Sequence, residues 1–486
     1  MAEIKRSKWD LSEVFSGDLE SEFGRLESLV AIFQTGRSDL TEDILPERFT
    51  EILEAYEEIN TGFWILEKWA ALKYAEDTRF SAIVANVDNF IAAQEGAIYF
   101  FDLWLMGLSQ ENFGRLVARV PSYQQALEKI RRYRETSLSE DAERAIKIKN
   151  ATGFLALGGI REEITSRFTY LDKKGKRITQ SDVTGLLCDD KGKVRAKTAK
   201  ALYGNFEKKA PLLGRIFITR MRDWYNEKVI LRGFSSPISA QNLINYVSDE
   251  ASETVLATCR EMAPSVFQRF FSLKKRLCKI GEEMTYADIY APPRKVSHDE
   301  IGFSRNIEEL IKSFASFSLQ AAQWVREVFE KGHVHSLDTP YKSAESSCTG
   351  FPKGIFPYIT SEFSDFLSEV GTPAHELGHL VQHLLSYQGQ SVLKHDPSLP
   401  LSEVGSTFFE MLHTDRLMGM TEGNKVLKRE ILINQLDEAY QNLMNMPFFV
   451  IFEKEAFDRI MSPEAQQLKI FPISITDYLE NNLEMF

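Results

Sequence analysis

The stretch that decides the fold and the chemistry of this chain is residues 372–383, which read TPAHELGHLVQH. His375 and His379 lie four positions apart, and residues with this spacing share one face of an α-helix. Thr372 is typical of a helix N-cap, and Pro373 suits a first helical turn, where its missing N–H group costs nothing. The stretch therefore predicts a helix that presents two imidazoles to one point in space.

The pattern His-Glu-x-x-His on a helix is typical of a zinc site. His375 and His379 can bind one ion, and neutral imidazole suits zinc, which lowers the pKa of a water that it binds to about 7. Glu376 is rotated by about 100° from His375 and stays close enough to reach such a water. We expect Glu376 to be the general base of a peptide hydrolysis. A surface helix with two unrelated histidines is the alternative interpretation.

A catalytic zinc needs a third protein ligand and an open fourth position. Glu403 and Glu410 follow the motif and lie seven positions apart, so they share one helix face. We expect Glu403 to be the third ligand and Glu410 to orient a ligand histidine. We therefore expect one zinc ion per chain. Without the histidine motif nearby, a solvated helix face would be the better interpretation of either carboxylate.

These motifs resemble a known family. His375-Glu-Leu-Gly-His379 followed by Glu403-Val-Gly-Ser-Thr is similar to the thimet oligopeptidase family, and more closely to its oligoendopeptidase F branch. The resemblance implies that His375, His379 and Glu403 bind zinc and that Glu376 is the catalytic base. It implies a zinc metalloendopeptidase that cleaves short peptides.

Weaker similarity to the family extends over most of the chain. It covers 9–11, 190–203, 286–292 and 356–359. Phe356, Tyr358 and Ile359 fall in the last of these segments, which resembles a strand along the substrate cleft. The resemblance implies a mostly α, two-lobed body with a deep central channel and a small β-element beside the active-site helix.

The end of the sequence departs from the family pattern. The family usually continues past the segment that resembles residues 452–455, with a helical segment whose His/Tyr cluster stabilises the intermediate. This sequence ends at Phe486, and no such cluster follows Glu403. Losing an oxyanion donor typically costs about 10² to 10³ in rate. A truncated relative that binds zinc and peptides with weak or no activity is therefore the second hypothesis.

The pattern of apolar residues predicts a largely helical chain. Few breakers are present, with 27 glycines and 16 prolines in 486 residues. Helical spacing is clear over 51–104, 190–203 and 306–331, while 171–176 is typical of a turn between extended pieces. Residues 349–360 predict loops with one or two short strands. We divide the sequence into an N-terminal helical lobe, residues 1–185, and a catalytic region, residues 186–486.

The composition of the sequence indicates which binding partners and which cellular compartment suit this chain. The net charge of −12 makes nucleic acid or an anionic membrane surface a poor partner. No run of about 18 apolar residues suggests a membrane span, and the N-terminus lacks the apolar segment of a signal peptide. Four scattered cysteines fit a reducing cytoplasm. Composition and motifs leave the oligomeric state open.

Several further side chains could reach the site, but a structural role is the better interpretation of each. His383 extends the motif by one turn, and a channel or surface position fits it better than a fourth ligand, which would block catalysis. We expect His413 to be a partly buried helix residue and Cys348 to be an inert thiol. The remaining histidines lie in polar stretches and are expected at the surface: His298, His333, His335 and His395.

Overall fold

The computed structural model describes residues 4–462 apart from short gaps. The gaps are 172–174, 176, 179, 282–283, 290, 293–300, 338, 340, 344, 353, 364, 366–370, 389 and 396. The chain forms two compact units, and each is built from two separate stretches of sequence. The first unit is Met1–Gly153 with Asp299–Met420, and the second is Phe154–His298 with Thr421–Phe486. The expected division is a single boundary between residues 185 and 186, whereas each compact unit combines two separate stretches. That division stays a prediction.

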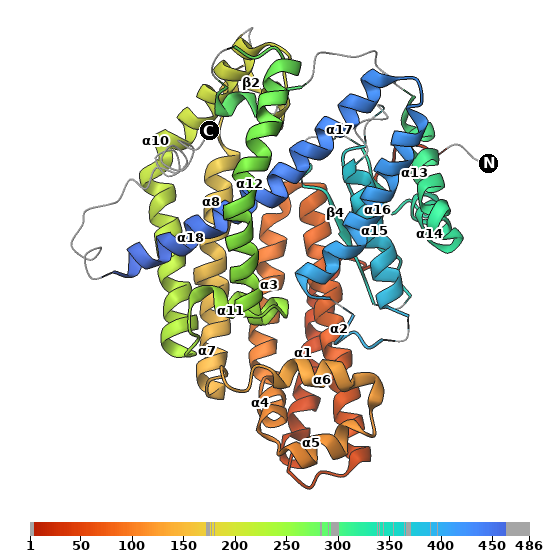
Figure 1. Cartoon of the computed structure of the whole chain (residues 1–486). Helices are drawn as coiled ribbons and strands as arrows, with labels where there is room; N and C mark the ends of the chain where they lie inside the picture. The colour runs from red at the N-terminus through yellow and green to blue at the C-terminus, as the bar shows by residue number, and fades with distance from the viewer. Residues whose placement is uncertain are drawn as a thin grey trace. The chain divides into compact units, whose positions relative to one another are not determined.

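Helices make up most of the first unit (Figure 1). They are α1 (Leu19–Thr35), α2 (Pro46–Glu76), α3 (Ser81–Ile98), α4 (Phe100–Gly107), α5 (Gln110–Val117), α6 (Gln124–Arg131), α7 (Glu140–Asn150), α13 (Phe303–Phe317), α14 (Leu319–Glu330), α15 (Gly371–Ser386) and α16 (Leu399–Met420). Its short strands are β3 (Val334–His335), β4 (Ser347–Thr349) and β5 (Tyr358–Thr360).

The second unit is also mainly helical. Its helices are α8 (Ala156–Ser166), α9 (Gln180–Leu187), α10 (Gly192–Tyr225), α11 (Pro237–Asn245), α12 (Asp249–Leu277), α17 (Lys425–Tyr440) and α18 (Met446–Met461). A hairpin pairs β1 (Tyr170–Leu171) with β2 (Arg177–Ile178) in antiparallel register, and Gly175 in its turn has a φ of +77°. The expected turn between extended pieces is therefore confirmed, and so is the mostly α fold.

The long N-terminal helices form as the apolar pattern predicts. Pro46 stands in the first turn of α2, where no backbone donor is lost. Apolar side chains of α2 are buried at three- and four-residue intervals and pack in the core formed with α1 and α3. The predicted helical stretch 51–104 is present as three successive helices, since Asp77 has an extended backbone and ends α2.

The prediction of one helix over 306–331 is wrong in one respect. Ser318 has an extended backbone, with φ −149° and ψ 122°, and it divides the stretch into α13 and α14. Its hydroxyl accepts a hydrogen bond from the backbone N–H of Ala321 and caps the second helix. Serine is tolerated in both helical and extended backbone conformations. The apolar residues keep their helical spacing on both sides of Ser318, so the sequence pattern did not reveal the break.

A small sheet lies against α15 in the first unit. The strand order is β3-β5-β4, with β3 parallel and β4 antiparallel to the central strand β5. Both β4 and β5 contact α15, which confirms the expected β-element beside the helix of the histidine motif. A second core forms where α13, α14, α15 and α16 meet this sheet. The expected deep channel stays a prediction. Among the helices that the structure describes, none is long and apolar enough to cross a membrane.

Candidate metal centre

Helix α15 carries the histidine motif on a face next to its buried face. Ala374, Leu377 and Leu380 are buried against the core, while His375 and His379 lie beside them and are half-buried. The helix begins at Gly371, so the expectation that Thr372 is the N-cap is wrong, and Thr372 lies within the first turn. Pro373 is also in that turn, where the backbone lacks a helical acceptor for its N–H in any case.

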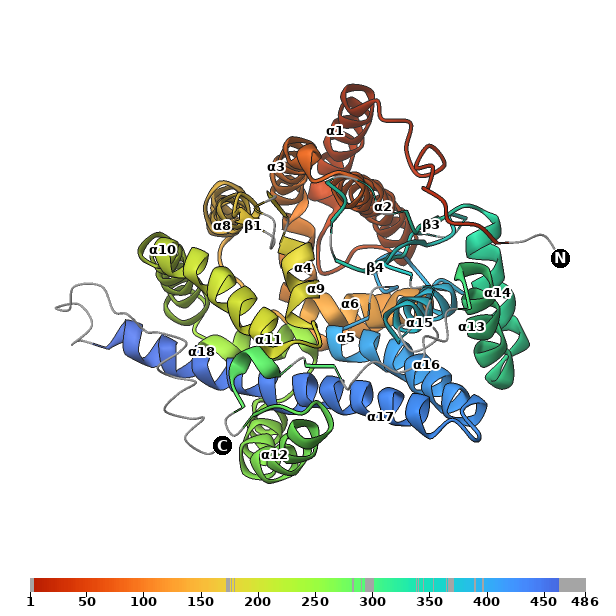
Figure 2. The ribbon, with the colours of Figure 1, turned by 90° about the horizontal axis from the view of Figure 1, so that it is seen from above.

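Helices α15 and α16 pack closely because two glycines meet at their contact. A Cβ atom on Gly378 would lie 2.6 Å from the Ser406 Cα and 2.7 Å from the Gly405 carbonyl oxygen. A Cβ atom on Gly405 would lie 2.5 Å from the Gln382 side-chain oxygen. A larger residue at position 378 would meet backbone atoms and push the helices apart, whereas one at position 405 would displace the Gln382 side chain. Figures 1 and 2 show the two helices side by side.

Gln382 fixes the start of α16 against α15. Its side-chain amide donates to the Leu401 carbonyl over 2.8 Å, and its side-chain oxygen accepts from the Gly405 N–H over 3.2 Å. These two bonds flank Glu403 in sequence and so set where its side chain lies. We did not identify Gln382, Gly378 or Gly405 as positioning residues from the sequence, since their role depends on a contact between distant segments.

The packing brings three ligand atoms together. Nε2 of His375 lies 3.2 Å from Oε2 of Glu403, and Nε2 of His379 lies 3.7 Å from the same oxygen. One ligand atom from each residue lies within 4.8 Å of the other two. Within the described part of the chain, this is the one group of three His, Cys, Asp or Glu side chains that converge in this way. The Glu403 side chain is 42% exposed, so the cluster can be reached from solvent.

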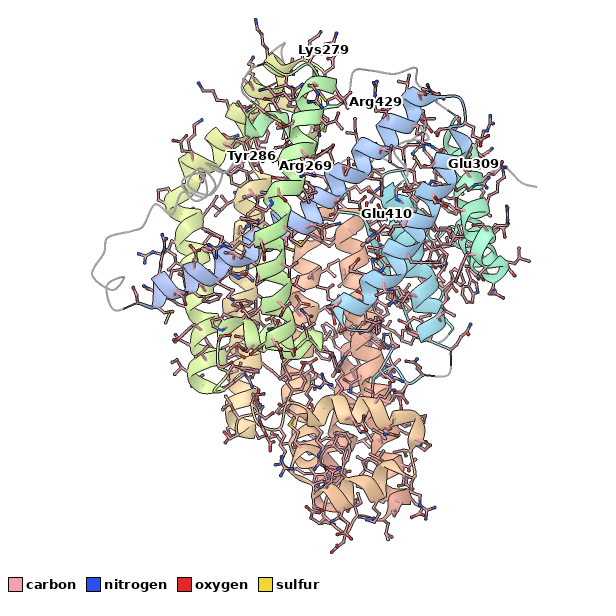
Figure 3. The ribbon with its side chains drawn as sticks, in the orientation of Figure 1. Arg269, Lys279, Tyr286, Glu309, Glu410 and Arg429 are labelled. Carbon is pink, nitrogen blue, oxygen red and sulfur yellow. The ribbon has the colours of Figure 1, made fainter. Side chains whose placement is uncertain are left out.

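A second carboxylate lies behind the first histidine. Nδ1 of His375 forms a hydrogen bond of 3.2 Å with Oε2 of Glu410, which is buried. Because Nε2 of the same ring points to Glu403, the two carboxylates hold the imidazole from both sides. The Ser406 hydroxyl donates to Oε2 of Glu403 over 2.9 Å. Figure 3 labels Glu410 on the helix that follows α15.

Burial and neighbouring carboxylates both shift the pKa values of the cluster. The hydrogen bond with Glu410 raises the pKa of His375, and burial lowers the pKa of His379. Burial raises the pKa of Glu376 to about 7; the charge of His375 opposes this shift, while the other two carboxylates add to it. Three carboxyl groups in so small a volume repel one another, and a cation placed among them would relieve this repulsion.

Of the three residues expected along a substrate cleft, Tyr358 and Ile359 lie on the central strand β5 and Phe356 lies two residues before it. Tyr358 and Ile359 are fully buried, and the Tyr358 hydroxyl donates to the Asp10 carbonyl over 2.9 Å. Phe356 is half-buried. Cys348 lies on the neighbouring strand β4, and burial together with the charge of Glu376 raises the pKa of its thiol well above the usual value. A thiol held protonated in this way is a poor nucleophile, as expected for an inert cysteine.

Three histidines that we expected at the surface are buried, so that expectation is wrong for His333, His335 and His395. His333 forms a hydrogen bond of 3.0 Å with Glu13 and stacks on the Tyr358 ring. Burial lowers the pKa of His335 to about 4. His395 packs between Trp64 of α2 and Tyr387, just beyond the end of α15. Short polar stretches of sequence did not reveal these contacts between distant segments. His298 lies outside the described residues.

The other two histidines considered for the site are not ligands in the cluster. His383 packs against Gly350, and burial lowers its pKa to about 4. His413 is buried as expected, and its Nδ1 lies 2.8 Å from the Ser313 hydroxyl oxygen. Neither ring belongs to the group of converging ligand atoms.

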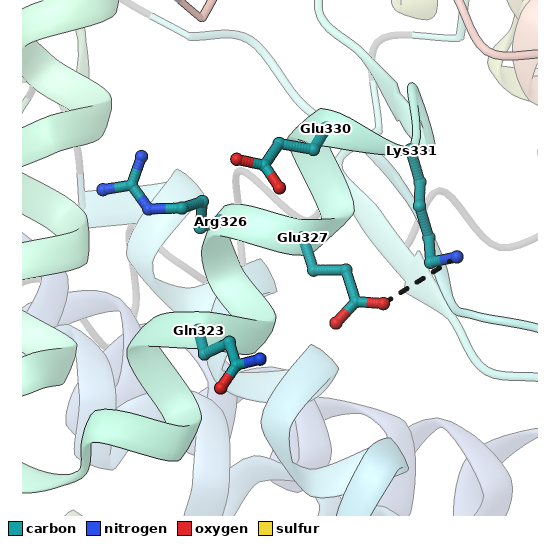
Figure 4. Close-up of a pocket in the computed structure, with 5 residues that line it drawn as sticks. All are labelled: Gln323, Arg326, Glu327, Glu330 and Lys331. Atoms are coloured by element: carbon teal, nitrogen blue, oxygen red, sulfur yellow. Dashed lines mark ion pairs between the residues drawn. The ribbon is translucent and has the colours of Figure 1, made fainter. Parts of the chain in front are cut away.

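A hollow on α14 is unrelated to this cluster. Figure 4 shows it lined by five polar or charged side chains of one helix and its end: Gln323, Arg326, Glu327, Glu330 and Lys331. Its ion pair, between Lys331 and Glu327, spans 3.8 Å between exposed groups, and such pairs contribute little. Because the lining comes from a single exposed helix face, it does not enclose a binding or catalytic site.

Comparison with known proteins identifies the family. The family model described as peptidase family M3 matches residues 187–481. The oligoendopeptidase F homolog of Lactococcus lactis subsp. lactis (strain IL1403) is 20% identical over 470 residues, which cover 92% of this chain and 75% of that protein. The group B oligopeptidase PepB of Streptococcus agalactiae serotype III (strain NEM316) is 21% identical over 471 residues, which cover 92% and 76%.

Solved structures show the same fold. Oligoendopeptidase-F from Enterococcus faecium superposes with a TM-score of 0.69 at 16% identity, covering 97% of this chain and 79% of that chain. PZ peptidase A in complex with an inhibitor superposes with a TM-score of 0.67 at 15% identity, covering 94% and 83%. Because the family model matches more than half of the sequence, this chain belongs to peptidase family M3, a family of zinc metallopeptidases, and it is a metalloendopeptidase of the oligoendopeptidase F branch.

Proposed function

We propose that the chain is a zinc-dependent oligoendopeptidase that hydrolyses short peptides, with one zinc ion held by His375, His379 and Glu403. The convergence of these three side chains carries the proposal. Two imidazoles and one carboxylate are a donor set that zinc accepts in catalytic sites, with a fourth position left for water or substrate. The relatives' names describe oligopeptidases, which supports short peptides as the substrate class.

The zinc ion and the protein side chains have different roles in the proposed reaction. A bound zinc ion supplies a Lewis acid that polarises a peptide carbonyl and makes water more acidic. Glu376 follows His375 on α15 and is buried beside the ligand cluster, so it can take a proton from the attacking water. It then passes that proton to the leaving amine. Glu410 holds the His375 ring in one orientation through Nδ1.

We propose that the substrate binds beside the small sheet that contacts α15. We assign Phe356, Tyr358 and Ile359 to the wall of the substrate cleft, in line with the family resemblance. Since Tyr358 and Ile359 are fully buried, they support this wall from inside, and half-buried Phe356 is the one of the three whose side chain can meet a peptide. A reducing compartment such as the cytoplasm fits the four free thiols.

The decisive experiment removes the base and spares the ligands. The Glu376→Gln variant should bind one zinc ion per chain and lose about 10² to 10⁴ of the cleavage rate, because general base catalysis contributes about this much. The assay is cleavage of a mixed set of short quenched-fluorescent peptides, with zinc content measured by atomic absorption. Glu330→Gln, at an exposed position on α14, is the matched control and should cleave as wild type does.

The two hypotheses from the sequence give different results. Zinc-dependent cleavage that is lost in Glu376→Gln establishes the peptidase mechanism. A Glu376→Gln variant that cleaves as fast as wild type would remove Glu376 from the mechanism. A folded wild-type protein that holds one zinc ion and cleaves none of the peptides would instead identify a relative that binds zinc and peptides without hydrolysing them.

A further inference from the structure

Helix α12 in the second unit has two apolar faces, and only one of them is buried. Its buried face packs Ala263, Phe267 and Phe270 against Ile433 and Tyr440 of α17. Figure 1 shows α12 crossing the line of α17 and α18, with both of which it is in contact. The second face carries four large apolar side chains that are exposed: Val255 (59%), Met262 (58%), Val266 (50%) and Leu273 (38%).

The four exposed residues form one continuous stripe. Their spacings of seven, four and seven positions keep them on one side of the helix, as in the seam of a coiled coil. Thr258, Ser265 and Ser272 are exposed along one edge of the stripe. These side chains are small, so another backbone could approach the helix closely there. The stripe is built like a helix-packing surface, although the core face of α12 already has its partner.

The stripe is symmetric about Pro264. Met262 and Val266 lie two positions on either side of it, and Val255 and Leu273 lie nine positions on either side. A second α12 placed antiparallel would therefore bring Val255 to the partner's Leu273 and Met262 to the partner's Val266. A self-complementary patch of this kind is what a two-fold symmetric contact requires.

The charges of α12 favour the same antiparallel arrangement. The first half of the helix is mainly acidic, and its exposed acidic residues include Glu250 and Glu261. The second half is basic, with Arg269 and Arg276 exposed and Lys279 just beyond the end. Figure 3 labels Arg269 and Lys279 towards this basic end. An antiparallel pair places acidic halves against basic halves, while a parallel pair would place like charges together.

We propose that α12 is a dimerisation surface, through which two copies of this chain pair antiparallel about an axis at Pro264. At 29 residues the helix is about 43 Å long, so a contact made by this face alone is smaller than the roughly 800 Å² per partner of a standard stable interface. The dimer is therefore concentration-dependent rather than permanent. The proposal is independent of the metal centre, which lies in the other unit.

Sedimentation velocity over a wide range of protein concentration tests the association. Wild type should shift from monomer to dimer as concentration rises, and Val266→Glu should remain monomeric because it places like charges near the axis. Ile32→Glu is the matched control, since Ile32 is 66% exposed on α1 in the first unit, and it should dimerise as wild type does. A wild-type protein that stays monomeric throughout overturns the proposal, as does equal dimerisation of Val266→Glu.

Disulfide cross-linking tests the orientation. In a background with Cys188→Ser and Cys259→Ser, Val255→Cys mixed with Leu273→Cys should form cross-linked dimers on oxidation. Val255→Cys alone should not, because the antiparallel pair holds the two copies of this position about 27 Å apart. Cross-linking of Val255→Cys with itself, at the efficiency of the mixture, would reverse the orientation and overturn the proposed contact.

Discussion

Two regions of the first unit, around the His375 ring and around the His413 ring, shift the pKa of a histidine in opposite directions. On α15, His375 has Glu403 on one ring nitrogen and Glu410 on the other, and the hydrogen bond with Glu410 raises its pKa. On α16, His413 has the Ser313 hydroxyl at Nδ1, and burial with the charge of Arg416 lowers its pKa to about 4. Both rings lie on one helix pair. The hydrogen-bonded carboxylate outweighs burial at His375, whereas burial is the largest effect on His413, so the first ring is suited to a cation and the second stays neutral.

The largest effect that this comparison predicts is on metal binding. Glu403→Ala removes the carboxylate that meets both histidines, and zinc affinity should fall by more than about 100-fold, which exceeds the usual cost of losing only an orienting partner. Competition with a chromogenic chelator measures the dissociation constant. Asp415→Ala is the matched control, because Asp415 is exposed on the same helix. A Glu403→Ala protein that retains wild-type affinity would place the third ligand elsewhere.

A smaller effect is expected around His413, where it concerns the pH dependence of the stability of the fold. The pKa of His413 is about 4 in the folded protein and about 6.5 when unfolded, so the unfolded chain binds the extra proton between these values. Stability is therefore lost as the pH falls from about 6.5 towards 4. His413 should account for about 2 kcal/mol of the loss between pH 7 and pH 5.

His413→Gln should remove this part of the pH dependence. Urea unfolding of wild type and variant at pH 7 and pH 5 measures it, because any packing defect of the variant is present at both pH values and cancels in the difference. The variant should lose about 2 kcal/mol less than wild type on acidification. An identical loss in the two proteins would show that His413 can be protonated in the folded state, and the contrast with His375 would fail.

The sequence revealed most of the candidate centre because the pattern there is local. A spacing of four on a helix places His375 and His379 together whatever the rest of the chain does. Glu403 and Glu410 could be linked to them only through the family pattern and helix periodicity, and the structure shows these four side chains in contact. Their assigned roles stay predictions until the variants are measured.

The parts that sequence did not reveal depend on contacts between distant segments. Gly378 and Gly405 matter because two helices cross there, and each glycine by itself is an ordinary helix residue. His333 and His335 lie in a polar stretch, yet residues from the N-terminal segment cover them. The mostly α fold followed from apolar periodicity, which is a local property, whereas the break at Ser318 left that periodicity intact.

The smallest effect in this series isolates the orienting carboxylate. Glu410→Gln keeps an oxygen that can accept from Nδ1 of His375 but removes the negative charge, so zinc affinity should fall about tenfold, the low end for loss of such a partner. In the zinc-free protein the pKa of His375, followed by NMR, should fall as well, because Glu410 is the main cause of its rise. Asp415→Asn, on the exposed side of α16, should change neither quantity.

The two measurements on Glu410→Gln together decide what the carboxylate does. If Glu410 acts on His375 through its charge, the zinc affinity and the pKa of His375 fall together in the variant. If it serves only to fill space beside Gly371, where a Cβ atom would lie 3.3 Å from its Oε1, the isosteric amide should leave both unchanged. The second result would remove the electrostatic distinction between His375 and His413. The first would show that one buried carboxylate, two turns beyond Glu403 on the same helix, prepares this imidazole for a metal ion.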